Sequence, residues 1–450
     1  MKKEYEKPLI QRLKTGLLNK FGAAPYYSRK IRKDIDGVLI QDLVEQYGSP
    51  LFVYSERHIR QEVRSLKEQF ATRYPKVELA WSYKTNYLKA ICALMHQEGS
   101  LAEVVSAMEY EKARALGVPG KDIIFNGPHK SRAILKRALE DGAKIHLDHF
   151  EELLELESLA DELGLRPQVG LRINLDSGIY PQWSRFGFNL ESGQAFEAAR
   201  RMHAKGKLTL DTLHCHIGTY IMEPKAYAQS AEKLVALAKK LKDDLGYQIT
   251  RLDLGGGFPS MGRLKGQYLP PEVSNASLEG FAEAISTALY ANLPPGDLPQ
   301  LYLESGRALV DEAGFLVTSI VAAKRLPDGR RAYVADAGIN LLYTSFWYRF
   351  NIELERDIKG ANEPSVLYGP LCMNIDVIDE GTQLPGLSKG DRLILSPVGA
   401  YNQTQSLQFI EYRPNVVLVR ENGQVDLIRE AETLEDIERR ECLPKDLKLS

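Results

Sequence analysis

Cysteine is scarce in this sequence: four cysteines lie far apart among 450 residues, and no two of them form a CxxC pair. This spacing argues against a disulfide framework or a zinc site and favours a reducing cytoplasm. No apolar run approaches the roughly 20 residues that span a bilayer. The formal net charge of −2 gives no overall attraction to nucleic acid or to an anionic membrane. We therefore expect a cytoplasmic protein with neither as a partner.

The N-terminal segment, residues 1–35, is rich in lysine and arginine but lacks the apolar stretch of a secretory signal. We expect it to be a solvated extension with one amphipathic turn around Leu9, Leu13 and Leu17. The rest of the chain has an ordinary globular composition, with 44% hydrophobic and 26% charged residues. A chain of this length exceeds what one hydrophobic core supports, which predicts two domains.

Short β-rich segments alternate with helical ones from about residue 50 to residue 308. The predicted strands are Val77–Tyr83, Leu101–Val105, Asp122–Asn126, Lys144–Asp148, Val169–Asn174, Thr212–His216, Arg251–Leu254 and Leu301–Glu304. The predicted helices include Glu56–Phe70, Met108–Leu116, Ser131–Asp141, Glu151–Leu163, Ala226–Leu245 and Leu278–Ala291. Eight such βαβ units predict a closed (β/α)8 barrel of the TIM type. An open doubly wound sheet is the alternative, although no GxGxxG follows the first strand.

After about residue 308, strand-like segments follow one another with few long helices. They are Phe315–Lys324, Arg331–Ala335, Ser365–Tyr368, Arg392–Pro397, Val416–Arg420 and Gln424–Arg429, the last two joined by an Asn-Gly hairpin signal. This half predicts an antiparallel β domain. The predicted division is a basic extension at 1–35, a strand or linker that joins the β domain at 36–50, a β/α barrel at 51–310 and the C-terminal β domain at 311–450.

Several chemically active residues follow predicted strands directly. The carboxyl ends of barrel strands face the active site, and both Lys84 and the run Gly255-Gly256-Gly257 lie at such ends. A glycine run can bring successive backbone N–H groups to an anion, although it also serves as a plain tight turn. Taken alone, Lys84 is equally consistent with a surface lysine beyond its strand.

Two histidines, a carboxylate and an arginine complete this set. Alternation places His214 and His216 on one face of their strand, where one of them could be a core histidine. Metal binding is disfavoured, because no carboxylate or third histidine is nearby in sequence. Glu304 ends its strand and could form a local ion pair with Arg307. Together, these segments place an amine, an anion-binding turn, an imidazole ring, a carboxylate and an arginine at one barrel mouth.

The ordered set of motifs resembles the fold-type III decarboxylases that depend on pyridoxal 5'-phosphate (PLP). This group contains diaminopimelate, ornithine and arginine decarboxylases, with alanine racemase as a distant relative, and the pattern is closest to the diaminopimelate enzymes. The matching segments are Trp81-Ser82-Tyr83-Lys84-Thr85-Asn86, His214-Cys215-His216-Ile217-Gly218, Asp253-Leu254-Gly255-Gly256-Gly257-Phe258-Pro259, Glu304-Ser305-Gly306-Arg307, Gly369-Pro370-Leu371-Cys372 and Gly399-Ala400-Tyr401. The resemblance covers about Asp36 to Pro444. It implies that the barrel at 51–310 binds PLP, an amino-acid substrate and a homodimer with active sites at its interface.

The resemblance also implies a role for each motif. Lys84 would hold the cofactor as a Schiff base, His216 would cover one face of its ring, and Glu304 would meet the pyridine nitrogen. Cys372, presented across the dimer interface, would return a proton to Cα after CO₂ leaves. The residues implied to bind phosphate are Gly255, Gly256, Gly257, Arg307 and Tyr401, of which the last two would also lie near the substrate. The family pattern implies no metal.

The sequence departs from the family pattern directly after Cys372, at residues that bind the far end of the substrate in family members. Family members usually carry an acidic residue directly after the interface cysteine, but here Met373 and Asn374 follow Cys372, and only Asp376 matches the motif's final aspartate. Loss of that acid predicts a substrate whose far end differs from a plain ammonium, which puts diaminopimelate itself in doubt. The candidate residues for contact with the substrate's far end are Trp347, Arg349 and Gln403. Alternatively, the carboxylate of Asp376 or Glu353 has taken the place of the missing acid.

Two other functions stay open at this point. A catalytically silent relative would bind a partner or regulate, but such proteins tend to lose the lysine or the phosphate turn, and both are present here. An amino-acid racemase of this barrel type would place a weaker partner than Glu304 at the pyridine nitrogen. The sequence therefore favours a PLP-dependent amino-acid carboxy-lyase.

Overall fold

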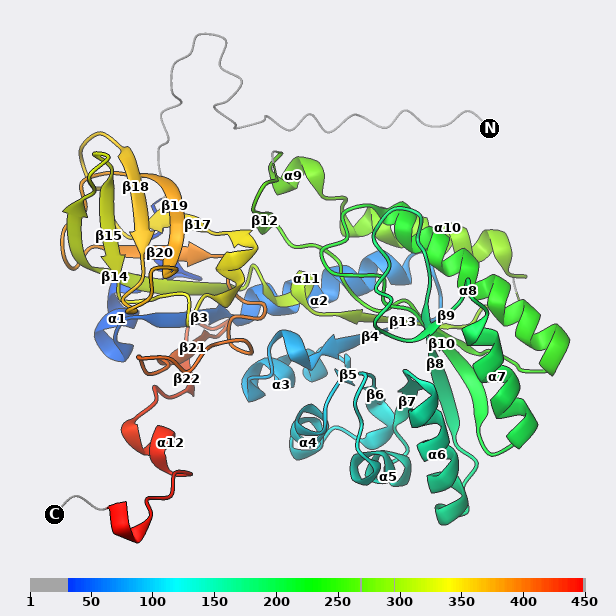
Figure 1. Ribbon diagram of the computed structural model, residues 1–450. Helices are drawn as coiled ribbons and strands as arrows, with labels where there is room; N and C mark the ends of the chain where they lie inside the picture. Colours follow the sequence, from blue (N-terminus) through cyan, green and yellow to red (C-terminus); the bar gives the residue numbers. More distant parts are fainter. Residues whose placement is uncertain (1–30, 268, 295, 448–450) are drawn as a thin grey trace, which may run out of the picture.

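Eight parallel strands form a closed barrel in this computed structural model, which describes residues 31–267, 269–294 and 296–447 (Figure 1). The barrel strands are β4 (Val77–Ser82), β5 (Leu101–Val104), β6 (Ile123–Phe125), β7 (Lys144–Leu147), β8 (Gln168–Asn174), β10 (Thr209–His214), β11 (Arg251–Asp253) and β13 (Gln300–Ser305). They pair in chain order, and the ring closes where β13 pairs with β4. The two-residue β9 (Phe188–Asn189) extends β8 as a side branch. The predicted closed barrel is confirmed.

Helices cover the outside of the barrel (Figure 1). They are α2 (Glu56–Ala71), α3 (Lys89–Gln97), α4 (Ala107–Ala115), α5 (Arg132–Glu140), α6 (Phe150–Leu163), α7 (Gln194–Lys205), α8 (Pro224–Leu245) and α10 (Leu278–Asn292), with the short α9 (Pro271–Ser274) and α11 (Arg307–Val310). The bounds of α8 follow from its sequence. Pro224 fits the first turn, where its missing N–H is not needed, and Gly246 ends the helix with a φ of 73°.

The barrel strands are buried on both faces, which explains their nearly continuous apolar sequences. In β8, for example, only Gln168 is exposed. The polar residues of these strands therefore stand out. Those at the carboxyl ends, such as Glu103 and Glu304, are buried at the same end of the barrel.

A second sheet of nine strands lies beside the barrel, at the left of Figure 1. It comprises β3 (Leu51–Ser55), β14 (Gly314–Arg325), β15 (Arg331–Ala335), β17 (Asn351–Leu354), β18 (Glu363–Tyr368), β19 (Val377–Leu384), β20 (Arg392–Ser396), β21 (Val416–Val419) and β22 (Val425–Arg429). Most pairs are antiparallel as predicted, but β15 with β18 and β3 with β21 run parallel. The sequence did not predict β3, β17 or β19.

The first strand of this sheet comes from the beginning of the chain. β3 pairs with β14 on one side and with β21 on the other, so residues 51–55 belong to the second sheet, although the predicted barrel begins at residue 51. The helix α1 (Ile40–Tyr47) follows a small hairpin of β1 (Asp34–Ile35) and β2 (Val38–Leu39). Its Ile40 and Leu43 pack on the outer face of this sheet in a separate small core.

The remaining described elements are small. β12 (Arg263–Leu264) pairs with β16 (Tyr348–Arg349) and so links the two domains. The short α12 (Leu434–Glu438) lies near the C-terminus. The amphipathic turn predicted around Leu9, Leu13 and Leu17 lies outside the described residues. Among the residues that the structure describes, no helix combines the length and apolar character needed to cross a membrane.

Candidate active site

A cavity of about 790 Å³ lies at the carboxyl ends of the barrel strands, and residues of the second domain help to enclose it. Its inner half is formed by strand ends and the turns after them: Ser82, Lys84, Glu103, Asn126, Arg172, His214, His216, Thr219, Gly257, Glu304, Arg307 and Tyr401. Its outer half is formed by Tyr180, Trp183, Arg185, Phe186, Met222, Leu264, Thr344, Trp347, Tyr348 and Gln405. This is the end at which barrels of this type carry their active sites.

Lys84 lies in a single 3₁₀ turn, η2 (Tyr83–Thr85), that directly follows β4. Its ammonium forms an ion pair with Glu103 at the end of β5. The second domain fixes the turn, because Tyr401 N donates to Thr85 O (2.7 Å) and Thr404 Oγ1 donates to Lys84 O (2.8 Å). Burial lowers the pKa of Lys84, but the carboxylates of Glu103 and Glu304 outweigh it, so the pKa of Lys84 lies above its usual value. The predicted position of this lysine inside the cavity is therefore the one observed.

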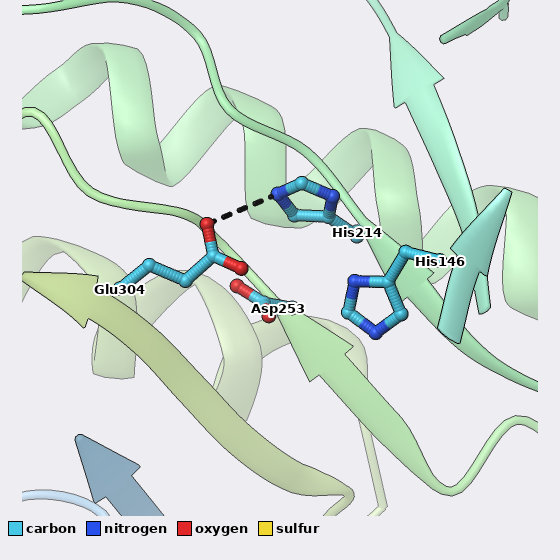
Figure 2. Close-up of side chains that lie close together, drawn as sticks. All are labelled: His146, His214, Asp253 and Glu304. Carbon is cyan, nitrogen blue, oxygen red and sulfur yellow. Dashed lines mark ion pairs between the residues drawn. The ribbon is translucent and has the colours of Figure 1, made fainter. Parts of the chain in front are cut away.

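Glu304 projects into the cavity from the end of β13 and is almost fully buried. Asn126 Nδ2 donates to its Oε1, and His214 Nε2 lies 3.4 Å from its Oε2 (Figure 2). The local ion pair with Arg307 is not present, because Arg307 Nη1 instead donates to Asp311 Oδ2 at 3.1 Å. Glu304 is therefore left facing the cavity with its carboxylate held by neighbours on other strands.

A cluster of four buried side chains surrounds this carboxylate. His146, His214, Asp253 and Glu304 come from β7, β10, β11 and β13, and one ligand atom from each lies within 4.8 Å of the others (Figure 2). The sequence argument against a metal relied on the absence of nearby carboxylates. That absence holds along the chain but not in space, because the closed barrel brings distant strand ends together.

His216 lines the cavity beside the glycine turn. Its Nδ1 accepts a hydrogen bond from Gly256 N (3.1 Å), and its ring contacts the edge of Trp183 at a centroid distance of 5.5 Å. Burial, with help from Arg172 and Lys84, lowers the pKa of His216 to about 3. The ring is therefore neutral at physiological pH, as a stacking surface requires.

The glycine turn differs from the predicted anion-binding nest. Gly255 N donates to Asp253 Oδ1 (2.8 Å) and Gly256 N donates to His216 Nδ1, so these two amides are already used. Of the three glycines, only Gly257 lines the cavity. A Cβ at Gly256 would lie 2.0 Å from Glu304 O, so this glycine is required by close packing of β11 against β13. Gly257 is thus the glycine of this run that faces the cavity, and phosphate binding by Gly255 and Gly256 stays a prediction.

Arg307 and Tyr401 lie together on the wall of the inner half. The guanidinium carbon of Arg307 is 5.0 Å from the Tyr401 ring centroid and 4.3 Å from that of Tyr348. Arg307 Nε is buried with no hydrogen-bond partner among the described residues. Tyr401 has a φ of 67°, a left-handed conformation that is rare for a bulky residue and recurs at functional sites. With Thr219 and Gly257, these residues form a set of donors suited to an anion.

The outer half is aromatic and cationic. Trp183 and Trp347 remain 38% and 50% exposed although they line the cavity. Arg185 stacks on Phe186 (5.2 Å) and forms no ion pair with another described residue. Among the described lining residues, the carboxylates are Glu103 and Glu304, and both belong to the inner half. The described residues of the outer half therefore provide no acidic partner for a distal ammonium.

Several residues predicted for the site lie elsewhere. Cys372 is exposed and does not line the cavity of its own chain. Arg349 is exposed on β16, and Gln403 Oε1 accepts from Arg429 (3.5 Å) away from the cavity. Asp376 is buried and accepts hydrogen bonds from Ile339 N (2.8 Å) and Leu371 N (2.7 Å).

Two of these positions correct the sequence analysis. The Asp376 carboxylate is committed to backbone amides that hold two loops together, so the structure does not support contact with substrate. Glu353, the other replacement carboxylate considered, is buried and paired with Arg32. Trp347 is the member of the predicted reading set that does line the cavity.

Some cavity residues were missed by the sequence analysis. Glu103 and Asn126 lie at the ends of predicted strands, so the rule that found Lys84 could also have found them. Trp183 and Arg185 lie in the irregular connection after β8, where no periodic pattern marks them. Their position becomes evident only from the fold.

Comparison with known proteins identifies the family to which this chain belongs. Residues 56–311 match the model described as "Pyridoxal-dependent decarboxylase, pyridoxal binding domain". The diaminopimelate decarboxylase of Bacillus subtilis is 31% identical over 417 residues, covering 90% of this chain and 94% of the relative. That of Methanothermobacter thermautotrophicus is 30% identical over 427 residues, covering 92% of this chain and 96% of the relative.

Solved structures agree with the fold. The structure of diaminopimelate decarboxylase from Methanocaldococcus jannaschii has a TM-score of 0.85 at 28% identity, covering 93% of this chain and 99% of the other. The Helicobacter pylori enzyme, solved in complex with L-lysine, has a TM-score of 0.78 at 26% identity, covering 89% and 98%. The likeness therefore extends over both domains.

Proposed function

Because this chain belongs to the family of pyridoxal-dependent decarboxylases, we propose that Lys84, Glu304 and Arg307 hold PLP in the inner half of the cavity. The protein is a PLP-dependent carboxy-lyase that acts on a small amino acid or amino-acid derivative. The observation that carries the site assignment is that one cavity contains an amine, a buried carboxylate and a guanidinium with a free donor. The identity of the substrate is a separate proposal, made below.

The residues of the inner half fit the chemical parts of PLP. The Lys84 amine suits covalent attachment at the aldehyde, and the Glu304 carboxylate suits a protonated ring nitrogen. Arg307 has an unpartnered buried Nε, and Thr219, Gly257 and Tyr401 line the same region, which suits a phosphate. The neutral His216 ring suits one face of the cofactor.

The reaction needs a group that accepts the electron pair left on Cα when CO₂ departs. When bound, PLP supplies this as an electron sink for the pair left behind by departing CO₂. Glu304 would maintain the sink by holding negative charge at the ring nitrogen. Lys84 must lose a proton before it attaches, and Glu103 Oε2, which contacts Lys84 Nζ, is placed to accept it.

Reprotonation at Cα requires a proton donor, a role that the family pattern assigns to Cys372. Cys372 is exposed outside the cavity of its own chain, as expected of a residue that serves a second subunit. We propose a homodimer in which Cys372 of each subunit donates a proton in the other subunit's site. A cytoplasmic location stays a prediction from the sequence.

The outer half supports a proposal on substrate class. Its described residues offer exposed tryptophans and an Arg185 without an ion pair among them, but no carboxylate. A guanidinium binds carboxylate or phosphate groups and repels ammonium. We propose that the substrate's far end carries an anionic group and no ammonium, in contact with Arg185.

The test is a CO₂-release screen with purified protein and PLP. Diaminopimelate, lysine and ornithine are compared with amino acids whose side-chain nitrogen is acylated by a carboxylate-bearing group. We expect the highest kcat/KM for an acylated, anionic substrate. The substrate proposal fails if lysine, ornithine or diaminopimelate is decarboxylated as efficiently as any other compound.

A further inference from the structure

The carboxyl groups of Asp253 and Glu304 lie side by side inside the barrel, as Figure 2 shows. Asp253 is fully buried and Glu304 is 4% exposed. One carboxyl oxygen of each belongs to a cluster whose atoms all lie within 4.8 Å of one another. Two buried carboxylates at such a separation do not both ionise, because the desolvated like charges repel. The pair therefore holds one proton.

The neighbours of the two groups differ and decide where that proton lies. Glu304 accepts a hydrogen bond from Asn126 Nδ2 at Oε1, and His214 Nε2 lies 3.4 Å from its Oε2 without a hydrogen bond. Asp253 receives a single backbone donor, Gly255 N at Oδ1, while its Oδ2 is buried without a hydrogen-bond partner among the described residues. Donors stabilise the charged form of a carboxyl group. Asp253 Oδ2 is fully buried and receives no donor from the described residues, so it is the better place for the proton.

We propose that Asp253 carries the single proton of this pair and donates it in a hydrogen bond to Glu304, as a positioning residue that keeps Glu304 ionised beneath the cofactor's ring nitrogen. The inference deepens the proposed function, since it rests on Glu304 as the partner of that nitrogen. Burial and the neighbouring Glu304 raise the pKa of Asp253 well above its usual value, which agrees with a protonated group at physiological pH.

Two histidines close the pair off from the barrel interior. The His146 and His214 rings lie 5.0 Å apart between centroids, and burial lowers the pKa of each well below its usual value. Both rings are therefore neutral and add no competing charge. Gly170 on β8 makes room for this arrangement, because a Cβ there would lie 2.4 Å from His146 Cδ2.

The cations that face the cluster are each matched by another acid. Lys84 pairs with Glu103. Lys130 forms an ion pair with Glu152, with 2.6 Å between Nζ and Oε1. Arg172 forms one with Asp148, with 3.7 Å between Nη1 and Oδ1. No excess positive charge from these neighbours is left to hold a second ionised carboxylate at Asp253.

Infrared difference spectroscopy tests the proton's position directly. A buried protonated carboxyl group gives a C=O band that moves to lower frequency in D₂O. We expect this band in the wild-type protein at alkaline pH, without added PLP, and its loss in Asp253→Asn. Asparagine keeps an acceptor for Gly255 N and a donor towards Glu304, so the fold is preserved. Glu109→Gln is the matched control, because burial raises the pKa of Glu109 only to about 7, and this group ionises at alkaline pH.

Cofactor binding supplies the second measurement. Asp253→Leu removes the donor to Glu304, and we expect PLP affinity to fall about 10- to 100-fold, with loss of the absorbance of the ring-protonated form. Asp253→Asn should retain that absorbance. Retention of the infrared band in Asp253→Asn with its loss in Glu304→Gln overturns the assignment, as does a stoichiometric divalent metal in the purified protein. If the band behaves as expected but no PLP is taken up, the proposed function fails and the proton assignment stands.

Discussion

The inner and outer halves of the cavity are built in different ways. The inner half comes mainly from the ends of barrel strands, with Tyr401 from the second domain, and its carboxylates are buried and held by hydrogen bonds or ion pairs from neighbouring strands. The outer half comes from an irregular connection and from the second domain, and it includes exposed tryptophans and an unpaired arginine. A rigid inner half suits chemistry shared across a family, whereas an outer half made of loops can change with the substrate.

The largest expected effect lies in the inner half, at Lys84. Replacing Lys84 by alanine removes the amine that attaches the cofactor, so kcat/KM should fall at least about 10³-fold and long-wavelength absorbance should disappear. Lys89→Ala, an exposed lysine on α3, is the control and should behave as wild type. Retention of the absorbance in Lys84→Ala would mean that another side chain holds the cofactor.

A smaller loss is expected at Cys372, for which we proposed a role in the site of a second subunit. Cys372→Ala should lower kcat by about 10²-fold, with cofactor absorbance intact, because a general acid is lost. Cys442→Ala, also an exposed cysteine, serves as the control. Mixing inactive Lys84→Ala with Cys372→Ala should restore part of the activity through hybrid dimers. No recovery despite measured subunit exchange would remove the cross-interface role.

The outer half should affect binding rather than chemistry. Arg185→Gln should raise KM for an anionic substrate about tenfold and leave kcat nearly unchanged, because the ion pair is made equally in the ground and transition states. Arg349→Gln changes an exposed arginine that does not line the cavity and should leave KM unaffected. The reverse result would mean that Arg349, as the sequence analysis proposed, binds the far end of the substrate.

The smallest effect concerns stability behind the inner half. Glu109 is buried at the start of α4, where burial and Glu103 raise its pKa from 4.5 to about 7. Between these values the folded protein holds a proton that the unfolded chain releases, so stability should fall as pH rises through this window, by about 1–3 kcal/mol. Glu109→Gln should remove this slope in urea unfolding measured across the window, whereas the exposed Glu111→Gln should keep it.

The sequence predicted the barrel well because each strand and helix has its own periodic pattern. Lys84 and Glu304 were found for the same reason, since Lys84 directly follows a predicted strand and Glu304 ends one. The partners of the Gly255 and Gly256 amides, Asp253 and His216, were not predicted, because neither bond leaves a mark in the sequence.

The outer half was harder to predict from the sequence. Arg185 lies in a connection without periodicity, yet it lines the cavity together with Trp347. Arg349 is only two residues from Trp347 in the sequence but does not line the cavity. Asp376 matched the family's motif by position, but its carboxylate serves backbone amides. Motif identity therefore located residues but did not determine their contacts.

The position of β3 also has a consequence for synthesis. This strand is made near the start of translation, but its two partners, β14 and β21, leave the ribosome only after the whole barrel and most of the chain. Until then, both edges of an apolar strand stay unpaired and open to association with other chains. We therefore expect a fragment that stops after the barrel to be prone to aggregation in cells, and release of the complete chain to be needed for a soluble protein.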